Sequence, residues 1–293
     1  MEVLQDMLGQ RHDPMLKAFT GLEGGVVAAG STCGVVSGGA VSLALMRLDE
    51  LTKDKAGTET AVLEQVRDYT RWFERQYGSF LCRNRSGVDF YSPGGQIRYL
   101  LPGDRVGKCL WHIRGAVRYI QGVTDRPLPV TPGKSAAATE DVPHCAGSVL
   151  KKIRERTGLG DDALDRVAFV FDGGVGLSGG VCGALAGAIL GLNLLLGLDV
   201  RSISFFRITR AFVAGHLNLL SDRPPDRAEP FYVGKTVVAR FFKEAAAMEC
   251  ATISGRQFSS PADFQDHLRA SDTCRRLIDR AADLAVAAIE KWR

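Results

Sequence analysis

The sequence predicts an all-α protein made of two tandem, related helical-bundle modules with glycine-striped central helices. Two observations support this prediction. Apolar residues recur at three- and four-residue spacing through most of the chain, and the motifs of the first half return in the same order in the second half. Alternating strand patterns are scarce, and the best of them, GVDFYS, is too short to define a sheet.

The composition indicates a globular protein. With 293 residues and 45% hydrophobic side chains, the chain can build one large core or two ordinary ones. The net charge is +4 and no dense block of Lys and Arg is present, so we expect no nucleic-acid partner. The N-terminal segment lacks the features of a secretory signal, and the seven cysteines are an odd number. We therefore expect a cytoplasmic protein whose thiols stay free, bind metal or do redox chemistry.

The clearest repeat is a glycine-rich segment that contains a Cys-Gly pair. LEGGVVAAGSTCGVVSGGAVSLAL, from Leu22, aligns without a gap with FDGGVGLSGGVCGALAGAILGLNL, from Phe171, at an offset of 149 residues. The alignment pairs Glu23 with Asp172 ahead of two glycines, and it pairs the two Cys-Gly dipeptides. We interpret the two acids as helix-end or turn residues whose side chains bond the backbone amides that follow them, and the alternative is a proton acceptor beside a thiol.

The remaining cysteines repeat as well. A Cys-x3-Ser-Gly-x2-Phe motif occurs at Cys82 and again at Cys250, and single cysteines near the start of amphipathic patterns occur at Cys109 and Cys274. Three cysteines of the first half thus have ordered counterparts in the second half. The seventh, Cys145, has none, because the first copy begins too late to contain one.

These repeats define the expected domains. The first module covers residues 1–122 and the second covers residues 142–293. Residues 123–141 are rich in Pro, Thr and small side chains and have no apolar period, so they are predicted to be a linker. Apart from the glycine-rich segments, the periodicity predicts helices over residues 60–78, 108–120, 142–158, 202–220, 233–249 and 272–292.

Each glycine-rich segment carries small residues at every fourth position. The series are Gly30, Gly34, Gly38 and Ser42 in the first copy and Gly179, Gly183, Gly187 and Gly191 in the second. At 3.6 residues per turn such a series lines one helix face and allows another backbone to approach closely. We expect a central buried helix in each copy, and one arrangement to consider packs the two stripes against each other.

The second glycine-rich segment also resembles a transmembrane dimerisation helix, because its 19 residues from Gly179 to Gly197 carry no charge. The counterpart in the first copy argues against a span, since Arg47, Asp49 and Glu50 follow it closely. Neither segment has aromatic and basic anchors at both ends. A membrane protein is therefore the less favoured interpretation.

The cysteine positions suggest chemistry at the ends of helices. Cys33 and Cys182 lie near predicted helix starts, where free amides and the helix dipole favour a thiolate. No Cys-x2-Cys pair occurs, which excludes a zinc ribbon, a ferredoxin-type run and c-type haem. The alternative for any single cysteine is an ordinary buried side chain, but ordered recurrence of three positions favours a shared site.

The pattern Cys145, Cys182-Gly-Ala-Leu-Ala-Gly, Cys250 and Cys274 resembles the C_GCAxxG_C_C family of redox-active proteins. The second copy is similar to the full motif, and the first resembles a degenerate copy that lacks the first cysteine. The resemblance implies a small all-helical module with a redox or electron-transfer role. Related modules in split-Soret-type cytochromes are associated with an iron–sulfur cluster.

The leading hypothesis is an iron–sulfur electron-transfer protein, with a cluster such as [2Fe–2S] on Cys145, Cys182, Cys250 and Cys274. In the first copy Cys33, Cys82 and Cys109 are candidate ligands, and His112 is a candidate fourth. The alternatives are a cluster-free thiol–disulfide redox protein and a helical scaffold or membrane subunit with inert cysteines. The redox partner protein and a homo-oligomeric state are left open.

Overall fold

The structure, a computed structural model, describes residues 1–53, 55–101, 103–124, 126, 128 and 143–293. The described residues are helical almost throughout and contain no named strand, only the isolated bridges Thr32–Leu81 and Val181–Glu249. The all-α prediction is confirmed. The first-module helices are α1 (Glu2–Met7), α2 (Asp13–Phe19), η1 (Thr20–Leu22), α3 (Gly34–Leu45), α4 (Leu48–Lys53), α5 (Lys55–Tyr77), α6 (Cys82–Ser86), α7 (Pro93–Leu100) and α8 (Asp104–Thr124).

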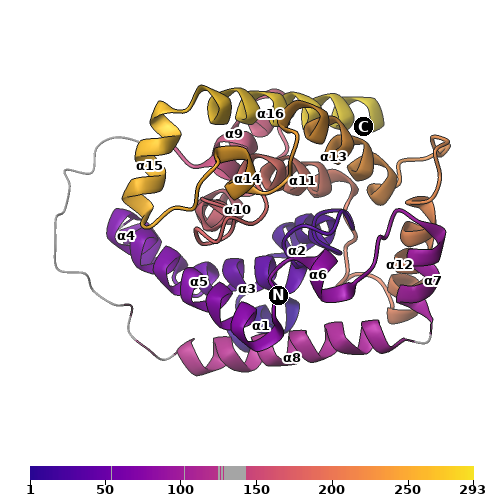
Figure 1. Cartoon of the computed structure of the whole chain (residues 1–293), viewed down its shortest axis with the longest axis horizontal. Coiled ribbons are helices and arrows are strands. Elements are labelled where there is room, and N and C mark those ends of the chain that lie inside the picture. Colours follow the sequence, from indigo (N-terminus) through magenta and orange to yellow (C-terminus); the bar gives the residue numbers. More distant parts are fainter. Residues whose placement is uncertain (54, 102, 125, 127, 129–142) are drawn as a thin grey trace.

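The second module repeats this order and adds a complete first helix (Figure 1). Its helices are α9 (Cys145–Thr157), α10 (Asp162–Val167), η2 (Ala168–Phe171), α11 (Gly183–Leu196), α12 (Phe205–Asn218), α13 (Pro230–Ala245), α14 (Cys250–Ser254), α15 (Pro261–Ala270) and α16 (Asp272–Trp292). The six helices predicted from periodicity are present as α5, α8, α9, α12, α13 and α16, with ends shifted by a few residues.

The two copies correspond element by element. The pairs are α2 with α10, η1 with η2, α3 with α11, α5 with α13, α6 with α14, α7 with α15 and α8 with α16. Helix α9 has only a partial counterpart in α1. At the offset of 149 residues, α1 matches residues 151–156, the last turns of α9.

The modules share one hydrophobic core. Helix α2 of the first module packs against α11 of the second. Helix α12 of the second module reaches the first, where His216 bonds Gln96 of α7 at 3.0 Å. Most of the predicted linker, residues 123–141, lies outside the described residues, although residues 123 and 124 end α8.

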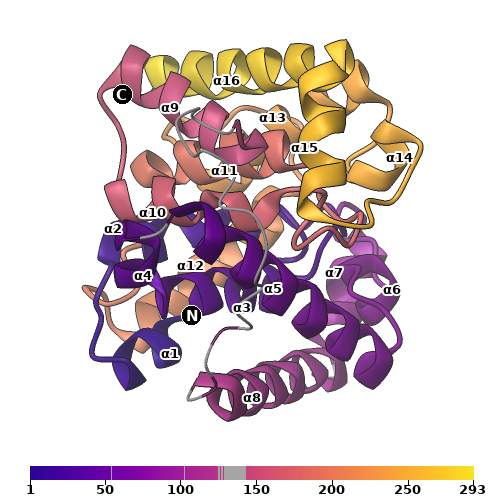
Figure 2. The same ribbon diagram turned by 90° about the vertical axis from the view of Figure 1, so that its left-hand side faces the viewer.

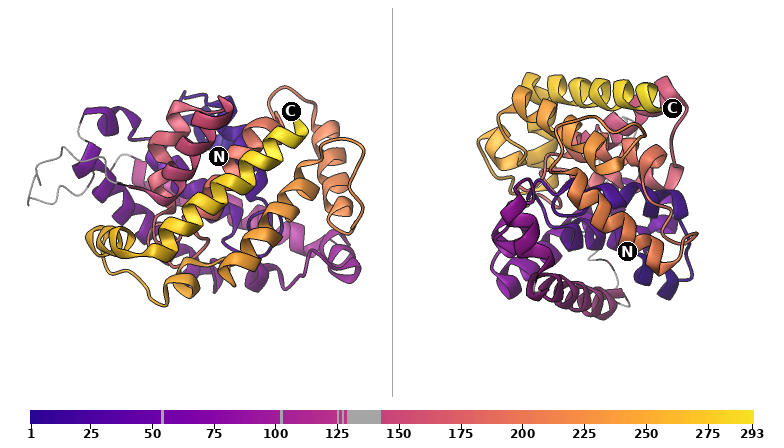
Figure 3. Two further views of the ribbon diagram at one scale, coloured as in Figure 1. Left: turned by 90° about the horizontal axis from the view of Figure 1, so that it is seen from above. Right: turned by 90° about the vertical axis from the view of Figure 1, so that its right-hand side faces the viewer.

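Helix α11 is the centre of the second module. Residues Gly183 to Asn193 are all buried, and α9 and α16 both pack against the helix. Figure 2 shows α16 along the edge of the molecule opposite to α8, and Figure 3 shows α13 and α16 lying side by side. No helix in the described part of the chain has both the length and the apolar character to cross a membrane.

The glycine stripe does not pack against its twin. A Cβ on Gly187 would lie 2.8 Å from the Ala146 carbonyl oxygen, so the α11 stripe faces α9. The stripe-to-stripe arrangement is therefore wrong, because α9 occupies that face. Gly30 and Gly179 also lie outside the helices, in left-handed loop positions with φ of 80° and 79°.

Candidate functional site

Two backbone hydrogen bonds hold the cysteines of each repeat together. In the second module the Cys182 amide donates to the Met248 carbonyl at 2.7 Å, and the Cys250 amide donates to the Gly180 carbonyl at 2.6 Å. The first module repeats this cross-connection. There the Cys33 amide donates to Phe80 at 2.8 Å and the Cys82 amide to Ser31 at 2.7 Å. The two distant motifs of each copy therefore form one structural unit.

The loops that lead to Cys33 and Cys182 contain several residues in the left-handed backbone conformation, and each cysteine lies where the loop meets its helix. The positive-φ glycines at these loops are 24, 25 and 30 in the first copy and 173, 174, 176 and 179 in the second. Non-glycine residues also take this conformation, among them Val26, Val27 and Val175. Because a left-handed L-residue costs roughly 1 kcal/mol or more, the surrounding packing must hold these loops in place.

The Cys-x3-Ser-Gly-x2-Phe motif forms a one-turn helix with a fixed end. The Ser254 hydroxyl donates to the Cys250 carbonyl at 2.8 Å, and Gly255 ends the helix with a φ of 69°. Phe258 then returns to the core. The first copy has the same bond from Ser86 to Cys82, at 2.8 Å. The motif thus orients a cysteine side chain toward the protein interior.

The second module brings its four cysteines to one buried cavity. Cys145 begins α9, Cys182 precedes α11, Cys250 begins α14, and Cys274 lies in the first turn of α16. All four line a closed space of about 10 Å³ whose other walls are mainly apolar. The thiols are close enough that negative charge on the Cys274 sulfur would raise the pKa of Cys145, Cys182 and Cys250.

Burial dominates the charge state of these thiols. Desolvation raises the pKa of Cys182 to about 11, although the amides of Ala184 and Leu185 at the start of α11 lower it. Burial also raises the pKa of Cys33 to about 11, against the lowering effect of the amides of Val35 and Val36. Burial likewise raises the pKa of Cys145 and Cys250. The expectation of thiolates at the helix starts is thus wrong for the unliganded protein, because burial outweighs the helix terminus.

Two histidines that the sequence did not single out border this site. His267 Nε2 lies 3.8 Å from the Cys274 sulfur, and His267 also lines the cavity. His144 Nδ1 lies 2.6 Å from the fully buried Asp172 carboxylate, and His144 Nε2 lies 3.4 Å from Glu59 of the first module. His144 has no counterpart in the first copy, and His267 matches Tyr99 of α7. Because the residue type differs between the copies, the repeat gave no signal for a histidine at either position.

Asp172 supports the backbone of the site. Its other oxygen accepts a 3.2 Å hydrogen bond from the amide of Cys145. The prediction that this carboxylate bonds the amides that follow it is wrong, because its backbone partner is the amide of Cys145 at the start of α9. Burial raises the pKa of Asp172, while Asp172 and Glu59 raise the pKa of His144 to about 10.

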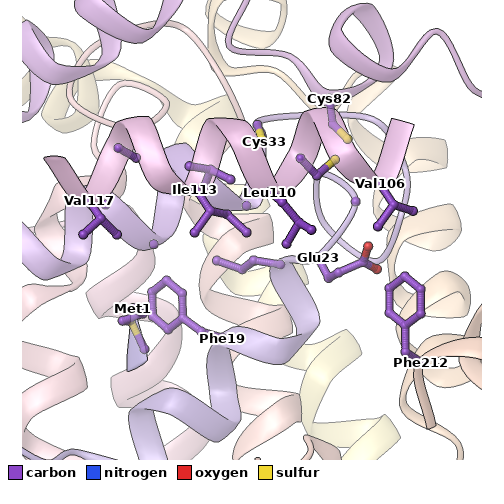
Figure 4. A pocket seen from close by; sticks show the side chains of 18 of the residues that line it. Met1, Phe19, Glu23, Cys33, Cys82, Val106, Leu110, Ile113, Val117 and Phe212 are labelled. Atoms are coloured by element: carbon purple, nitrogen blue, oxygen red, sulfur yellow. The ribbon is translucent and has the colours of Figure 1, made fainter. Parts of the chain in front are cut away.

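The first module brings three cysteines to a much larger cavity. Cys33, Cys82 and Cys109 line a space of about 420 Å³ (Figure 4). Burial raises the pKa of all three thiols, and the Tyr99 hydroxyl is hydrogen-bonded to Cys109. Tyr99 lies six residues after Pro93, the first residue of α7, as His267 lies six residues after Pro261, the first residue of α15.

Residues 1–109 and 143–288 match the family model described as "Putative redox-active protein (C_GCAxxG_C_C)". The chain belongs to the C_GCAxxG_C_C family. The two matched segments confirm the tandem arrangement of C_GCAxxG_C_C modules. No curated protein and no solved structure matches the chain in the corresponding comparisons.

His112 does not join the cysteines of the first C_GCAxxG_C_C module. It is buried against Tyr77, and its Nε2 lies 2.8 Å from the Arg85 guanidinium. Burial, with help from Arg85 and Lys108, lowers the pKa of His112 to about 4, so the ring is neutral and accepts from Arg85. It is not among the residues that line the cavity.

The C_GCAxxG_C_C cysteines of the second module fit an iron–sulfur cluster in donor number and type. Four cysteine thiols are the usual ligand set of such clusters. Within the described residues, no three His, Cys, Asp or Glu side chains are placed to hold a single metal ion. A cluster spreads its thiolates over two or more irons, so its ligands lie farther apart than those of one ion. The cavity of about 10 Å³ must widen to admit it.

Proposed function

We propose that the second module binds an iron–sulfur cluster through Cys145, Cys182, Cys250 and Cys274 and transfers electrons with it. The observation that carries this proposal is the meeting of four cysteines from four separate segments at one buried cavity. Loops and helix starts that are far apart in sequence hold them there, and an inert core has no need of four thiols at one point. The family description, redox-active, supports the same class of function.

The chain's own groups suit this role. When bound, the cluster would supply one-electron redox chemistry, with a potential that depends on hydrogen bonds to sulfur and on solvent exposure. Ile253, Phe264 and Ile278 exclude water from the cysteines. His267 is placed to donate to the Cys274 sulfur, and an N–H donor there stabilises the more negative, reduced state.

The charge state of the thiols also favours ligation over thiol exchange. A nucleophilic cysteine is partly exposed and has a lowered pKa. The pKa of Cys182 is instead raised, and this side chain is buried. Cluster binding would deprotonate the four thiols and release protons, so assembly should be favoured at higher pH.

A second candidate is a thiol–disulfide redox protein without a cluster. The narrow cavity favours it, because about 10 Å³ leaves the four free thiols close together with no room for a larger group. Two thiols would form one disulfide and release two electrons and two protons to an acceptor protein. Burial of the thiols argues against rapid exchange with such a partner.

Anaerobic expression and purification separates these candidates. We expect brown protein that absorbs between about 400 and 450 nm, with equal amounts of iron and sulfide. Cys182→Ser should abolish the colour, whereas Cys33→Ser, the matched change in the first module, should keep it. Colourless, iron-free wild-type protein would contradict the cluster. Disulfides between Cys182 and another cysteine of the same cavity, found by mass spectrometry after oxidation, would then support the second candidate.

A further inference from the structure

The cavity of the first module is a structural difference between the two copies. In the second module α9 packs against both α11 and α16 and covers the glycine stripe of α11. A Cβ on Gly183 would lie 2.8 Å from the Cys145 Cβ, and one on Gly191 would lie 2.4 Å from the Ile153 side chain. In the first module a Cβ on Gly38 would meet nothing nearer than the Met1 Cβ, at 4.0 Å.

Helix α1 fills only part of this space. Leu4 matches Ile153 at the offset of 149 residues, and both are buried. The resulting cavity of about 420 Å³ lies between α3 and α8, within the range of about 300–1,000 Å³ that is usual for small-molecule sites.

The walls of this cavity are apolar and incompletely covered. Figure 4 shows Val106, Leu110, Ile113 and Val117 of α8 pointing into it. Leu110 remains 61% exposed and Ile113 44%, whereas Ile278, which corresponds to Ile113, is 7% exposed. Covering such side chains stabilises a complex by about 25 cal/mol per Å² of apolar surface removed from water.

One polar pair at the rim has unused hydrogen-bonding capacity. Glu23 is the only acidic or basic side chain among the residues that line the cavity. Its Oε2 lies 3.4 Å from Nε2 of the fully buried His216, and neither atom has a hydrogen-bond partner. The two atoms lie within ion-pair distance of each other, and a donor in the cavity would give the Glu23 oxygen the hydrogen bond that buried polar atoms nearly always have.

We propose that this cavity binds a small apolar ring compound with one hydrogen-bond donor, of the phenol class. The ring lies between α3 and α8, and the donor reaches the Glu23 carboxylate. A partner helix fits less well, because α1 already fills the end of the path that α9 takes, and the remaining turn or two would be unstable alone. The raised pKa values of the three cysteine thiols keep these three side chains uncharged, which suits an apolar ligand.

The test uses the whole protein and two probes, 1-naphthol and 1-methoxynaphthalene, which lacks the donor. We expect 1-naphthol to bind at least about tenfold more tightly, as for one hydrogen bond to a charged group. Gly38→Leu should fill the cavity and abolish binding, while Gly122→Leu on the exposed side of α8 should leave it unchanged. Iron content should not change in either variant, so the result is independent of the proposed cluster.

Four outcomes would overturn this proposal. They are no binding to the wild type, equal affinity for the two probes, unchanged binding in folded Gly38→Leu protein, and displacement of 1-naphthol by a peptide of residues 144–157. If Gly38→Leu does not fold, the site is tested in the wild type by the rate of alkylation of the half-buried Cys109, with and without 1-naphthol. 1-Naphthol should slow that alkylation, and absence of protection counts against the site.

Discussion

At the scale of single residues, two opposing effects set the pKa of the site cysteines, and their relative size depends on the folded structure. The sequence places Cys33 and Cys182 at helix starts, and the helix amides do lower their pKa. Burial has the opposite effect and is larger, because a charged sulfur loses its hydration in the core. The glycine-rich sequence ahead of each cysteine was enough to predict its place at a helix start, but it did not indicate how deeply the thiol is buried.

His112 gives a prediction that can be tested at this scale. We expect its imidazole to stay neutral until the pH falls to about 4, because burial and the Arg85 guanidinium oppose protonation. The unfolded chain binds a proton near pH 6.5, so stability is lost as the pH falls from about 6.5 to 4, by about 1–3 kcal/mol. The assigned NMR signal of the ring should titrate near pH 4. A midpoint between pH 6 and 7 would contradict the prediction, and His112→Asn identifies the signal.

At the scale of helices, equivalent glycines have different neighbours in the two modules. Gly187 touches the α9 backbone, and its counterpart Gly38 faces a cavity. The regular spacing predicted that another segment approaches this face, and α9 does so in the second module. The identity of that segment could not be predicted, because small residues on a helix face allow a close approach by any backbone segment.

Alanine at these two positions should have opposite effects. Gly187→Ala brings a methyl group within 3.0 Å of α9 backbone atoms, so α9 must move away from α11. We expect a loss of about 1–3 kcal/mol in the free energy of unfolding. Gly38→Ala meets no close atom and should gain up to about 1 kcal/mol from helix propensity. Urea unfolding measures both, and a stabilised Gly187→Ala protein would show that α9 does not pack on the stripe.

The sequence was sufficient for the fold class, the repeat and the cysteines of the site. Its helical periodicity, ordered cysteines and left-handed glycine pairs are local features, and each has a direct counterpart in the structure. The pair His216–Glu23 joins segments far apart in sequence, and His267 meets Cys274 across the turn between α15 and α16. A single sequence holds no signal for such contacts, because the residues that meet have no repeated spacing.

At the scale of the whole molecule, the duplicated modules are joined by a contact between matching loops. The Thr32 hydroxyl accepts a 2.7 Å hydrogen bond from the amide of Val181, and both residues precede the Cys-Gly pair of their module. Arg83, inside the Cys-x3-Ser-Gly helix of the first module, forms an ion pair at 2.7 Å with Glu249, which directly precedes that of the second. The two cysteine sites therefore lie back to back across the shared core.

This junction should make the two modules unfold together. In Thr32→Val the Val181 amide stays buried without an acceptor, so we expect a loss of about 1–3 kcal/mol in the free energy of unfolding. Thr70→Val is the matched control, because the Thr70 hydroxyl only donates to a carbonyl inside α5, and its loss should be below about 1 kcal/mol. Trp72 reports unfolding of the first module and Trp292 that of the second, each measured by fluorescence in a protein that keeps only this tryptophan. The two unfolding transitions should coincide, with and without Thr32→Val, because a shared core couples the modules. Two separate wild-type transitions would contradict the joint core.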